Sequence, residues 1–359
     1  MRNLNFKSAL ALLVLFVVTP LLAANDGTLD PAFGIGGKVQ VPQEGSWHGD
    51  WYATDVALQS TGKIVIAGWT NRSLTQCFVL RLNIDGSLDT SFGGGNGFSP
   101  GYYGFEHCRY TSVVVRADDR ILAGGEDLGN TQTRGYIEAF TANGQPDASF
   151  GTQATAAYFL EPNSGDPSIE INRIALDADG NIIAAGQYLH MNGNRDFHVV
   201  RIAADGSSSV QANYSFQTAS SNDDIAYDLA IAPDGSYYLG GTATSNLGDP
   251  DCALAHFHYT AQNGIEPDAT FTGNVAGITI GLNYGGNNAD YCFALAYSPP
   301  PFDGLLLGGG SYEGTNYNVA TFIAQPLNGS ATGRAVLPFD YGTEYAGEVN
   351  YATRVLTQA

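Results

Sequence analysis

The stretch DVALQSTGKIVIAG, residues 55–68, decides the fold, because the rest of the chain repeats its pattern. It reads as an apolar strand, a polar turn, a second apolar strand and a closing glycine. Two apolar runs joined across such a turn predict a β-hairpin. Four further copies follow: SVVVRADDRILAG (112–124), RIALDADGNIIAAG (173–186), DLAIAPDGSYYLGG (228–241) and, with an expanded turn, ALAYSPPPFDGLLLGG (294–309). The closing glycines of the five hairpins are Gly68, Gly124, Gly186, Gly241 and Gly309.

A second element follows the hairpins. It reads FVLRLNIDGSLDTSFG at 78–93, YIEAFTANGQPDASFG at 136–151, FHVVRIAADGS at 197–207 and ALAHFHYTAQNGIEPDATF at 253–271. A less regular strand comes next, for example at 38–41, 153–160 and 276–284. Each unit of about 60 residues therefore carries four predicted strands.

Repeated four-stranded antiparallel units are typical of the blades of a β-propeller. A β-helix has shorter repeats, and a row of sandwich domains would need about 100 residues for each domain. We therefore predict an all-β protein, a β-propeller with five complete units and a partial sixth.

The two chain ends are predicted to share that sixth unit. GTLDPAFG, at 27–34, is the tail of a second element, and YATRVLTQA, at 351–359, matches YATDVALQS, at 52–60, without gaps. The second and third strands of the sixth unit have no counterpart in the sequence. We expect a single domain over 25–359 that is truncated at its C-terminus; the alternative is an open or imperfectly closed ring.

The paired elements resemble the delta-60 repeat family of bacterial secreted and surface proteins. The resemblance covers nearly all of the chain after the N-terminal segment, and it is strongest over 27–151 and weakest in the fifth unit. It implies a propeller-like fold and export. It implies no activity, so it transfers no functional residues.

The N-terminus predicts export. Arg2 and Lys7 precede an apolar run at 9–22, and Ala23 and Ala24 follow it, which is the pattern of a signal peptide over 1–24. An uncleaved anchor is the alternative reading, although the run is short for a membrane span, which needs about 20 residues. We expect a secreted or periplasmic bacterial protein with no membrane span after cleavage. The formal net charge of −20 argues against nucleic acid as a partner.

Four cysteines in an exported chain suggest two disulfides. Cys77 and Cys252 both begin the third strand of their units, and Cys108 and Cys292 both precede the first strand of the next unit. The repeat therefore selects Cys77–Cys108 and Cys252–Cys292 from the three possible connectivities. Free or metal-bound thiols are the alternative.

One face of the propeller should carry the variable connections between units, where function concentrates on a rigid scaffold. The aromatic and polar residues in two of these connections could stack on a sugar or contact a protein; alternatively, they pack between blades. The candidate binding residues are Trp47, His48, Asp50, Trp51, Tyr52, Tyr102, Tyr103 and His107.

The sequence indicates no catalytic residue, no metal site and no cofactor. Asp177, Asp179 and Asn181 resemble part of a calcium loop but lie in a hairpin turn, and His256 and His258 share one face of a strand without a third zinc ligand. These features favour an exported, non-enzymatic scaffold that binds an unknown ligand, for example carbohydrate or a cell-surface protein. The alternative is a propeller enzyme, a lyase or glycan hydrolase, with acids at the central channel.

Overall fold

The computed structural model describes residues 29–41, 50–71, 75–99, 107–129, 132–151, 156–216, 223–244, 249–268, 271, 278–280, 290–299, 304–313, 316–324 and 331–337. Over these residues the chain forms strands, turns and bends, without a helix. The predicted signal peptide and the repeat at 351–359 lie outside them. None of the described segments is a helix that could cross a membrane.

The strands form five antiparallel sheets, which we call blades one to five. Blade one holds β1 (Asp50–Leu58), β2 (Ile64–Asn71) and β3 (Thr75–Leu82). Blade two holds β4 (Cys108–Val115), β5 (Ile121–Asp127), β6 (Arg134–Phe140) and β7 (Ala157–Leu160). Blade three holds β8 (Ser168–Leu176), β9 (Ile182–Leu189), β10 (Arg195–Ile202) and β11 (Ser209–Tyr214). Blade four holds β12 (Ile225–Ile231), β13 (Tyr237–Thr244), β14 (Pro250–Thr260), β15 (Gly264–Pro267) and β16 (Ile278–Ile280). Blade five holds β17 (Asp290–Ser298), β18 (Gly304–Glu313), β19 (Asn316–Ala324) and β20 (Ala331–Leu337).

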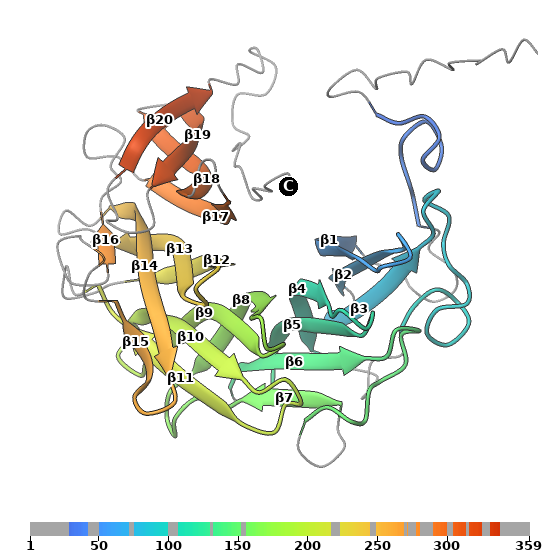
Figure 1. Cartoon of the computed structure of the whole chain (residues 1–359), viewed down its shortest axis with the longest axis horizontal. Helices are drawn as coiled ribbons and strands as arrows, with labels where there is room; N and C mark the ends of the chain where they lie inside the picture. Colours follow the sequence, from blue (N-terminus) through green and yellow to red (C-terminus); the bar gives the residue numbers. More distant parts are fainter. Residues whose placement is uncertain are drawn as a thin grey trace, which may run out of the picture.

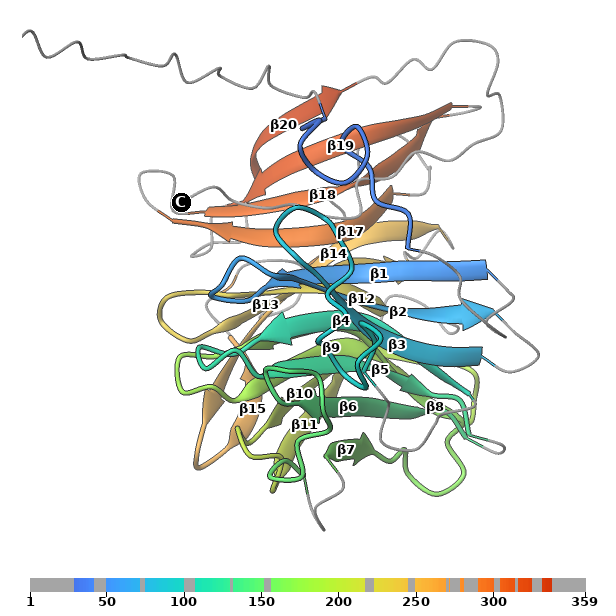
Figure 2. The same cartoon turned by 90° about the vertical axis from the view of Figure 1, so that its right-hand side faces the viewer.

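The blades are arranged in an arc around a central axis, with the first strand of each blade innermost (Figure 1). The predicted β-propeller of five repeated units is confirmed. Over the described residues, the arc is open between blade five and blade one (Figure 1). Blade one therefore forms one side of the molecule, and it faces the viewer in Figure 2.

The fourth strand of blade one is reduced to an isolated bridge between Leu80 and Phe98. Gly93, Gly95 and Gly97 around it have positive φ angles, which a regular strand cannot accommodate. The predicted strand at 38–41 is likewise reduced to a single bridge between Gly34 and Lys38.

A β-bulge interrupts the first strand of every blade at the same repeat position. In blade one the bulge falls between Ala53 and Asp55, so that Thr54 is the bulged residue. The backbone carbonyl two residues before the bulged residue then lies against a glycine of the second strand. A Cβ atom at this glycine would lie far inside contact distance of that oxygen. The glycines are Gly68, Gly125, Gly186, Gly241 and Gly309. The structure thus corrects the sequence prediction in blade two, where Gly125 and not Gly124 is the equivalent residue.

The bulged residues also join consecutive blades. The hydroxyl of Thr54 donates to the carbonyl of Tyr110 at 2.8 Å, and the hydroxyl of Thr111 donates to the carbonyl of Ile171. The amide of Asn172 donates to the carbonyl of Ala226 at 2.8 Å. Each contact links the innermost strand of one blade to that of the next, so the bulge fixes how neighbouring blades sit together.

The residue after the bulge is charged in blades one, three and four, and these three side chains meet near the central axis. Arg173 of blade three donates to Asp55 of blade one at 2.7 Å and to Asp228 of blade four at 2.6 Å. All three side chains are largely buried. The two aspartates also accept backbone N–H groups of the following blades, Val113 and Leu295. This axial cluster links blade three to its neighbour, blade four, and also to blade one, which is not its neighbour in the chain.

A second set of inter-blade contacts lies at the outer corner of the blades. The N–H of Gly93 donates to the carbonyl of Asn143 in blade two, and the N–H of Gly151 donates to the carbonyl of Asp205 in blade three; both bonds are 2.8 Å long. Apolar clusters fill the space between the sheets. The chain thus builds a core between each pair of blades.

Both predicted disulfides are present, Cys77–Cys108 and Cys252–Cys292. Each joins the third strand of one blade to the first strand of the next, β3 to β4 and β14 to β17. Cys77 and Cys252 occupy the same repeat position on the third strand, opposite Trp69 and Thr242. On the first strand the two bonds differ by two residues, because Cys108 pairs with Asp127 whereas Cys292 pairs with the bulge glycine Gly309.

Two adjacent glycines in β13 test the bulge contact. We expect Gly241→Ala to lower the free energy of unfolding by about 1–3 kcal/mol, because the new Cβ would overlap the carbonyl of Ile225. Gly240→Ala is the matched control, since its Cβ would meet Leu295 at an ordinary 3.4 Å. Denaturant titration measures both; equal effects of the two substitutions would contradict the role of the bulge.

Candidate functional site

The candidate site lies at the end of the propeller where the first strand of each blade begins and the second strand ends. We call this end the mouth face. In each blade, the residue two positions before the bulged residue has a cross-strand partner on the second strand. These pairs form a row that runs along the mouth face from blade to blade. In blades one to three the cross-strand pairs are Tyr52 with Trp69, Arg109 with Glu126, and Glu170 with Gln187.

The blade-one end of the row is an aromatic platform. The rings of Tyr52 and Trp69 stack with centroids 4.2 Å apart and planes inclined by 19°. Tyr52 is 41% exposed, so the platform is open to solvent. The guanidinium carbon of Arg109 lies 4.9 Å from the Trp69 ring centroid, a cation–π contact that carries the row into blade two.

The row continues with two carboxylates. An Nη atom of Arg109 lies 4.0 Å from a carboxylate oxygen of Glu126, and the side-chain amide of Gln187 donates to Glu170. Burial raises the pKa of Glu126 to about 7, and the charge of Glu170 adds to the effect. At neutral pH this carboxyl group therefore exists in both protonation states, and it can donate or accept a hydrogen bond.

The structure separates the predicted binding residues that it describes. Trp51 packs against Phe78 and Phe98, with ring centroids 4.9 and 5.5 Å away, on the opposite face of β1 from Tyr52. Asp50 is exposed at the start of β1. His107, with a φ angle of 86°, precedes β4, and its N–H donates to the carbonyl of Thr75 at 2.5 Å. Trp47, His48, Tyr102 and Tyr103 lie outside the described residues.

The acids on the central axis are arranged as ion-pair partners. Both carboxylates of the axial cluster, Asp55 and Asp228, bind the same guanidinium group of Arg173. Opposite charges held at such distances stabilise one another. The carboxyl groups of the row, in contrast, have a single cation at ion-pair distance among the described residues, which is Arg109 beside Glu126.

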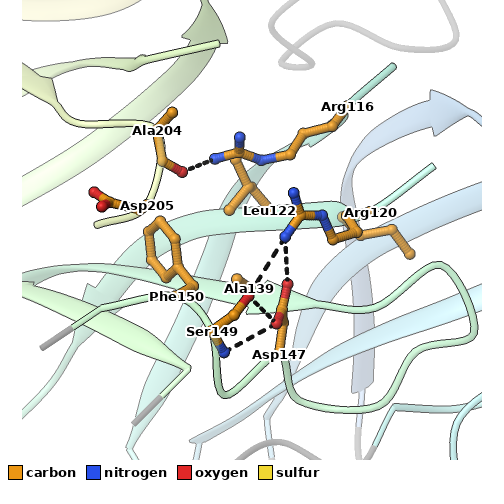
Figure 3. A pocket seen from close by; sticks show the side chains of 10 residues that line it. Arg116, Arg120, Leu122, Ala139, Asp147, Ser149, Phe150, Ala204 and Asp205 are labelled. Carbon is orange, nitrogen blue, oxygen red and sulfur yellow. Dashed lines mark hydrogen bonds and ion pairs between the residues drawn. The ribbon is translucent and has the colours of Figure 1, made fainter. Parts of the chain in front are cut away.

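A small pocket lies at the opposite end of the propeller, between blades two and three (Figure 3). Arg116 donates across it to the carbonyl of Ala204, and Arg120 contacts both Asp147 and Ser149 (Figure 3). The ring of Phe150 lines it (Figure 3). Because these side chains bond to one another and to the neighbouring blade, the pocket belongs to the inter-blade contacts.

The side chains of the two sequence patterns that resemble metal sites make other contacts in the structure. One carboxylate oxygen of Asp177 accepts the N–H groups of Asp179 and Asn181, which closes the hairpin turn. The His256 ring stacks on Tyr238 at 4.0 Å and lies 3.0 Å from Asp268. Within the described residues, no group of three or more histidines, cysteines or acids could hold a metal ion.

Sequence reasoning found Tyr52 but not the other members of the row. Trp69, Arg109, Glu126 and Glu170 lie inside or beside predicted strands, where side chains usually pack. A signal was nevertheless present in the sequence: each second strand continues beyond its glycine, and a large side chain follows the glycine or glycine pair, Trp69 in blade one and Glu126 in blade two.

The raised pKa of Glu126 predicts a pH-dependent stability. A carboxyl group that binds its proton more tightly in the folded state favours folding at low pH, and this contribution is lost as the pH rises from about 4.5 to about 7. Glu126→Gln should therefore gain stability relative to the wild type by about 1–3 kcal/mol between pH 4.5 and pH 8. Urea unfolding at both pH values measures this; a pH-independent difference would contradict the assignment.

Three segments of the chain match one family model. Residues 59–92, 116–150 and 178–208 match the family described as "Domain of unknown function (DUF5122) beta-propeller". Each matched segment runs from the hairpin turn of a blade into the corner after its third strand. No curated protein sequence matches the chain.

Solved structures match the chain at low similarity. The Hadza microbial sialidase Hz136 has a TM-score of 0.46 and 11% identity, over 80% of this chain and 58% of the sialidase chain. Sqt1 from Chaetomium thermophilum has a TM-score of 0.44 and 14% identity, over 86% of this chain and 64% of its own. The chain thus spans less than two thirds of either structure. The matched segments and the five observed blades support a β-propeller built from repeats.

Proposed function

We propose that this protein is an exported, non-enzymatic binding module, and that carbohydrate binds to the row of side chains on its mouth face. The observation that carries the proposal is the solvent-exposed stack of Tyr52 on Trp69 beside Arg109. Two disulfides are compatible with an extracellular or periplasmic location. We further propose that the repeats are those of the delta-60 family, whose members are exported.

The chemistry of the row suits a sugar. An exposed aromatic face accepts the apolar face of a pyranose ring, and charged groups beside it accept and donate hydrogen bonds to the hydroxyl groups. Arg109 supplies donors, while Glu126 and Glu170 supply acceptors. The row spans three blades that the inter-blade contacts hold rigidly, so the site needs little ordering when a ligand binds.

A glycan array with the folded protein, followed by calorimetric titration of the glycans that bind, tests this function. We expect Tyr52→Ala to weaken binding by at least about 10-fold, since a stacking contact is lost, and Tyr52→Phe to retain binding. Val210→Ala, at an exposed apolar residue of the outer strand β11, is the control and should bind like the wild type. Unchanged affinity of Tyr52→Ala, or an array without any bound glycan, would refute the carbohydrate proposal.

A second candidate is a glycan hydrolase or lyase that uses the same row. Glu126 favours it, because a carboxyl group with a pKa of about 7 beside another carboxylate can act as a general acid at neutral pH. Mass spectrometry of each bound glycan after prolonged incubation separates the two functions. Intact glycans support the binding module; cleavage that disappears in Glu126→Gln would establish the enzyme.

A further inference from the structure

The pocket between blades two and three exists because blade two lacks an arginine that blades one and three carry. In blade one, the guanidinium group of Arg81 fills the equivalent corner. Its Nε donates to Asp89 at 2.7 Å, and its central carbon lies 4.6 Å from the Phe92 ring centroid. The equivalent residue is Ala139 in blade two and Arg201 in blade three. The small side chain of Ala139 leaves a partly open cavity of about 180 Å³.

Two guanidinium groups from the hairpin of blade two line this cavity, those of Arg116 and Arg120 (Figure 3). Arg116 occupies the position of Gln59 in blade one, at the start of the hairpin turn. The side chain of Gln59 donates to the carbonyl of Ala142 in blade two. The side chain of Arg116 donates to the equivalent carbonyl in blade three, that of Ala204. Blade two therefore keeps the inter-blade bond and adds a positive charge to the corner.

The charge of Arg116 is not balanced by an ion pair. Among the described residues, no carboxylate lies within ion-pair distance of Arg116, and its side chain makes one hydrogen bond, to the carbonyl of Ala204. Burial lowers the pKa of Arg116, and the charge of Arg120 adds to the effect. An anion in the cavity would relieve both effects, because it would pair with the two positive charges.

Arg120 is paired on one side only. Its Nε donates to Asp118 at 2.7 Å, and one of its Nη atoms donates to Asp147 at 3.1 Å. Its second Nη atom has no hydrogen bond within the described part of the chain and lies on the side of Arg116 (Figure 3). N–H groups of both arginines are therefore available to one ligand.

The third carboxylate near the cavity, that of Asp205 in blade three, does not take this place. Asp205 is exposed, and its carboxylate accepts the N–H of Ser207 at 2.9 Å, within its own turn. In Figure 3 it lies beyond the carbonyl of Ala204 and points away from Arg116. The cavity itself has the volume of about six water molecules, at about 30 Å³ for each in the liquid, which is enough for a small anion.

We propose that this cavity binds an oxyanion, free or as the carboxylate, sulfate or phosphate group of a larger molecule, between the guanidinium groups of Arg116 and Arg120. Guanidinium groups bind such anions through paired, charge-assisted hydrogen bonds. Partial burial strengthens the attraction, because it reduces the screening by water and salt. The site lies at the end of the propeller opposite the mouth face, so it does not depend on the proposed binding of carbohydrate.

Calorimetric titration of the full chain with inorganic sulfate, inorganic phosphate and acetate, at constant ionic strength, tests the proposal. We expect saturable binding of at least one of these anions. Arg116→Gln should weaken it by at least about 10-fold, because charge-assisted hydrogen bonds are lost. This variant should fold, since glutamine makes the same inter-blade bond at position 59 of blade one.

Two further variants control the test. Arg195→Gln removes the same charge from an arginine at the mouth end of blade three, and it should bind the anion like the wild type. The double variant Arg116→Gln and Ala139→Arg rebuilds the bonded pair of Gln59 and Arg81 from blade one, fills the cavity and should bind no anion.

The absence of saturable binding by the wild type for all three anions would overturn the proposal. Equal affinities of the wild type and Arg116→Gln would also overturn it, because the anion would then bind elsewhere. Tighter binding of acetate supports the site and assigns it to carboxylate groups. Tighter binding of sulfate or phosphate supports it and assigns it to tetrahedral anions.

Discussion

The β-bulge in the first strand of each blade is the constraint on which the rest of the structure depends. It turns the bulged side chain out of its own sheet and toward the next blade, where Thr54, Thr111 and Asn172 each meet a backbone carbonyl. It also directs the following residue to the axis. The same backbone distortion therefore sets the spacing of neighbouring blades, the charged axial cluster and the need for glycine in the second strand.

Contacts at the corners of the blades recur even where the side chains that make them change. The carboxylate of Asp89 in blade one binds Arg81 from the third strand. Lys63 from the hairpin turn binds the same carboxylate at 2.6 Å. In blade two, the residue equivalent to Arg81 is Ala139, and only the hairpin cation is kept, because Arg120 binds Asp147. One of the two ion pairs is therefore repeated at this corner, and the other is specific to blade one.

The sequence predicted the fold and the disulfides because both follow from spacing. Hairpin turns and closing glycines recur at a regular interval, and in two units one cysteine lies on the third strand and the other near the start of the next first strand. The candidate site was predicted only in part. The platform joins Tyr52 to Trp69 across one sheet and then to Arg109 of the next blade, and contacts between blades depend on the bulge register. That register is not visible in a pattern of apolar residues, as the shift from Gly124 to Gly125 illustrates.

The place of the candidate site on the repeat has a physical reason. Two residues before the bulged residue, the backbone carbonyl lies against the glycine of the second strand, and the fold depends on this contact. The side chain at that position points to the mouth face and takes no part in this contact. The fold can therefore accept any side chain there, and the five blades carry an unrelated set: Tyr52, Arg109, Glu170, Ile225 and Tyr291. Where the backbone is fixed and the side chain is not, a position can acquire a binding residue without loss of stability. The row on the mouth face is therefore the part of this repeat most suited to function.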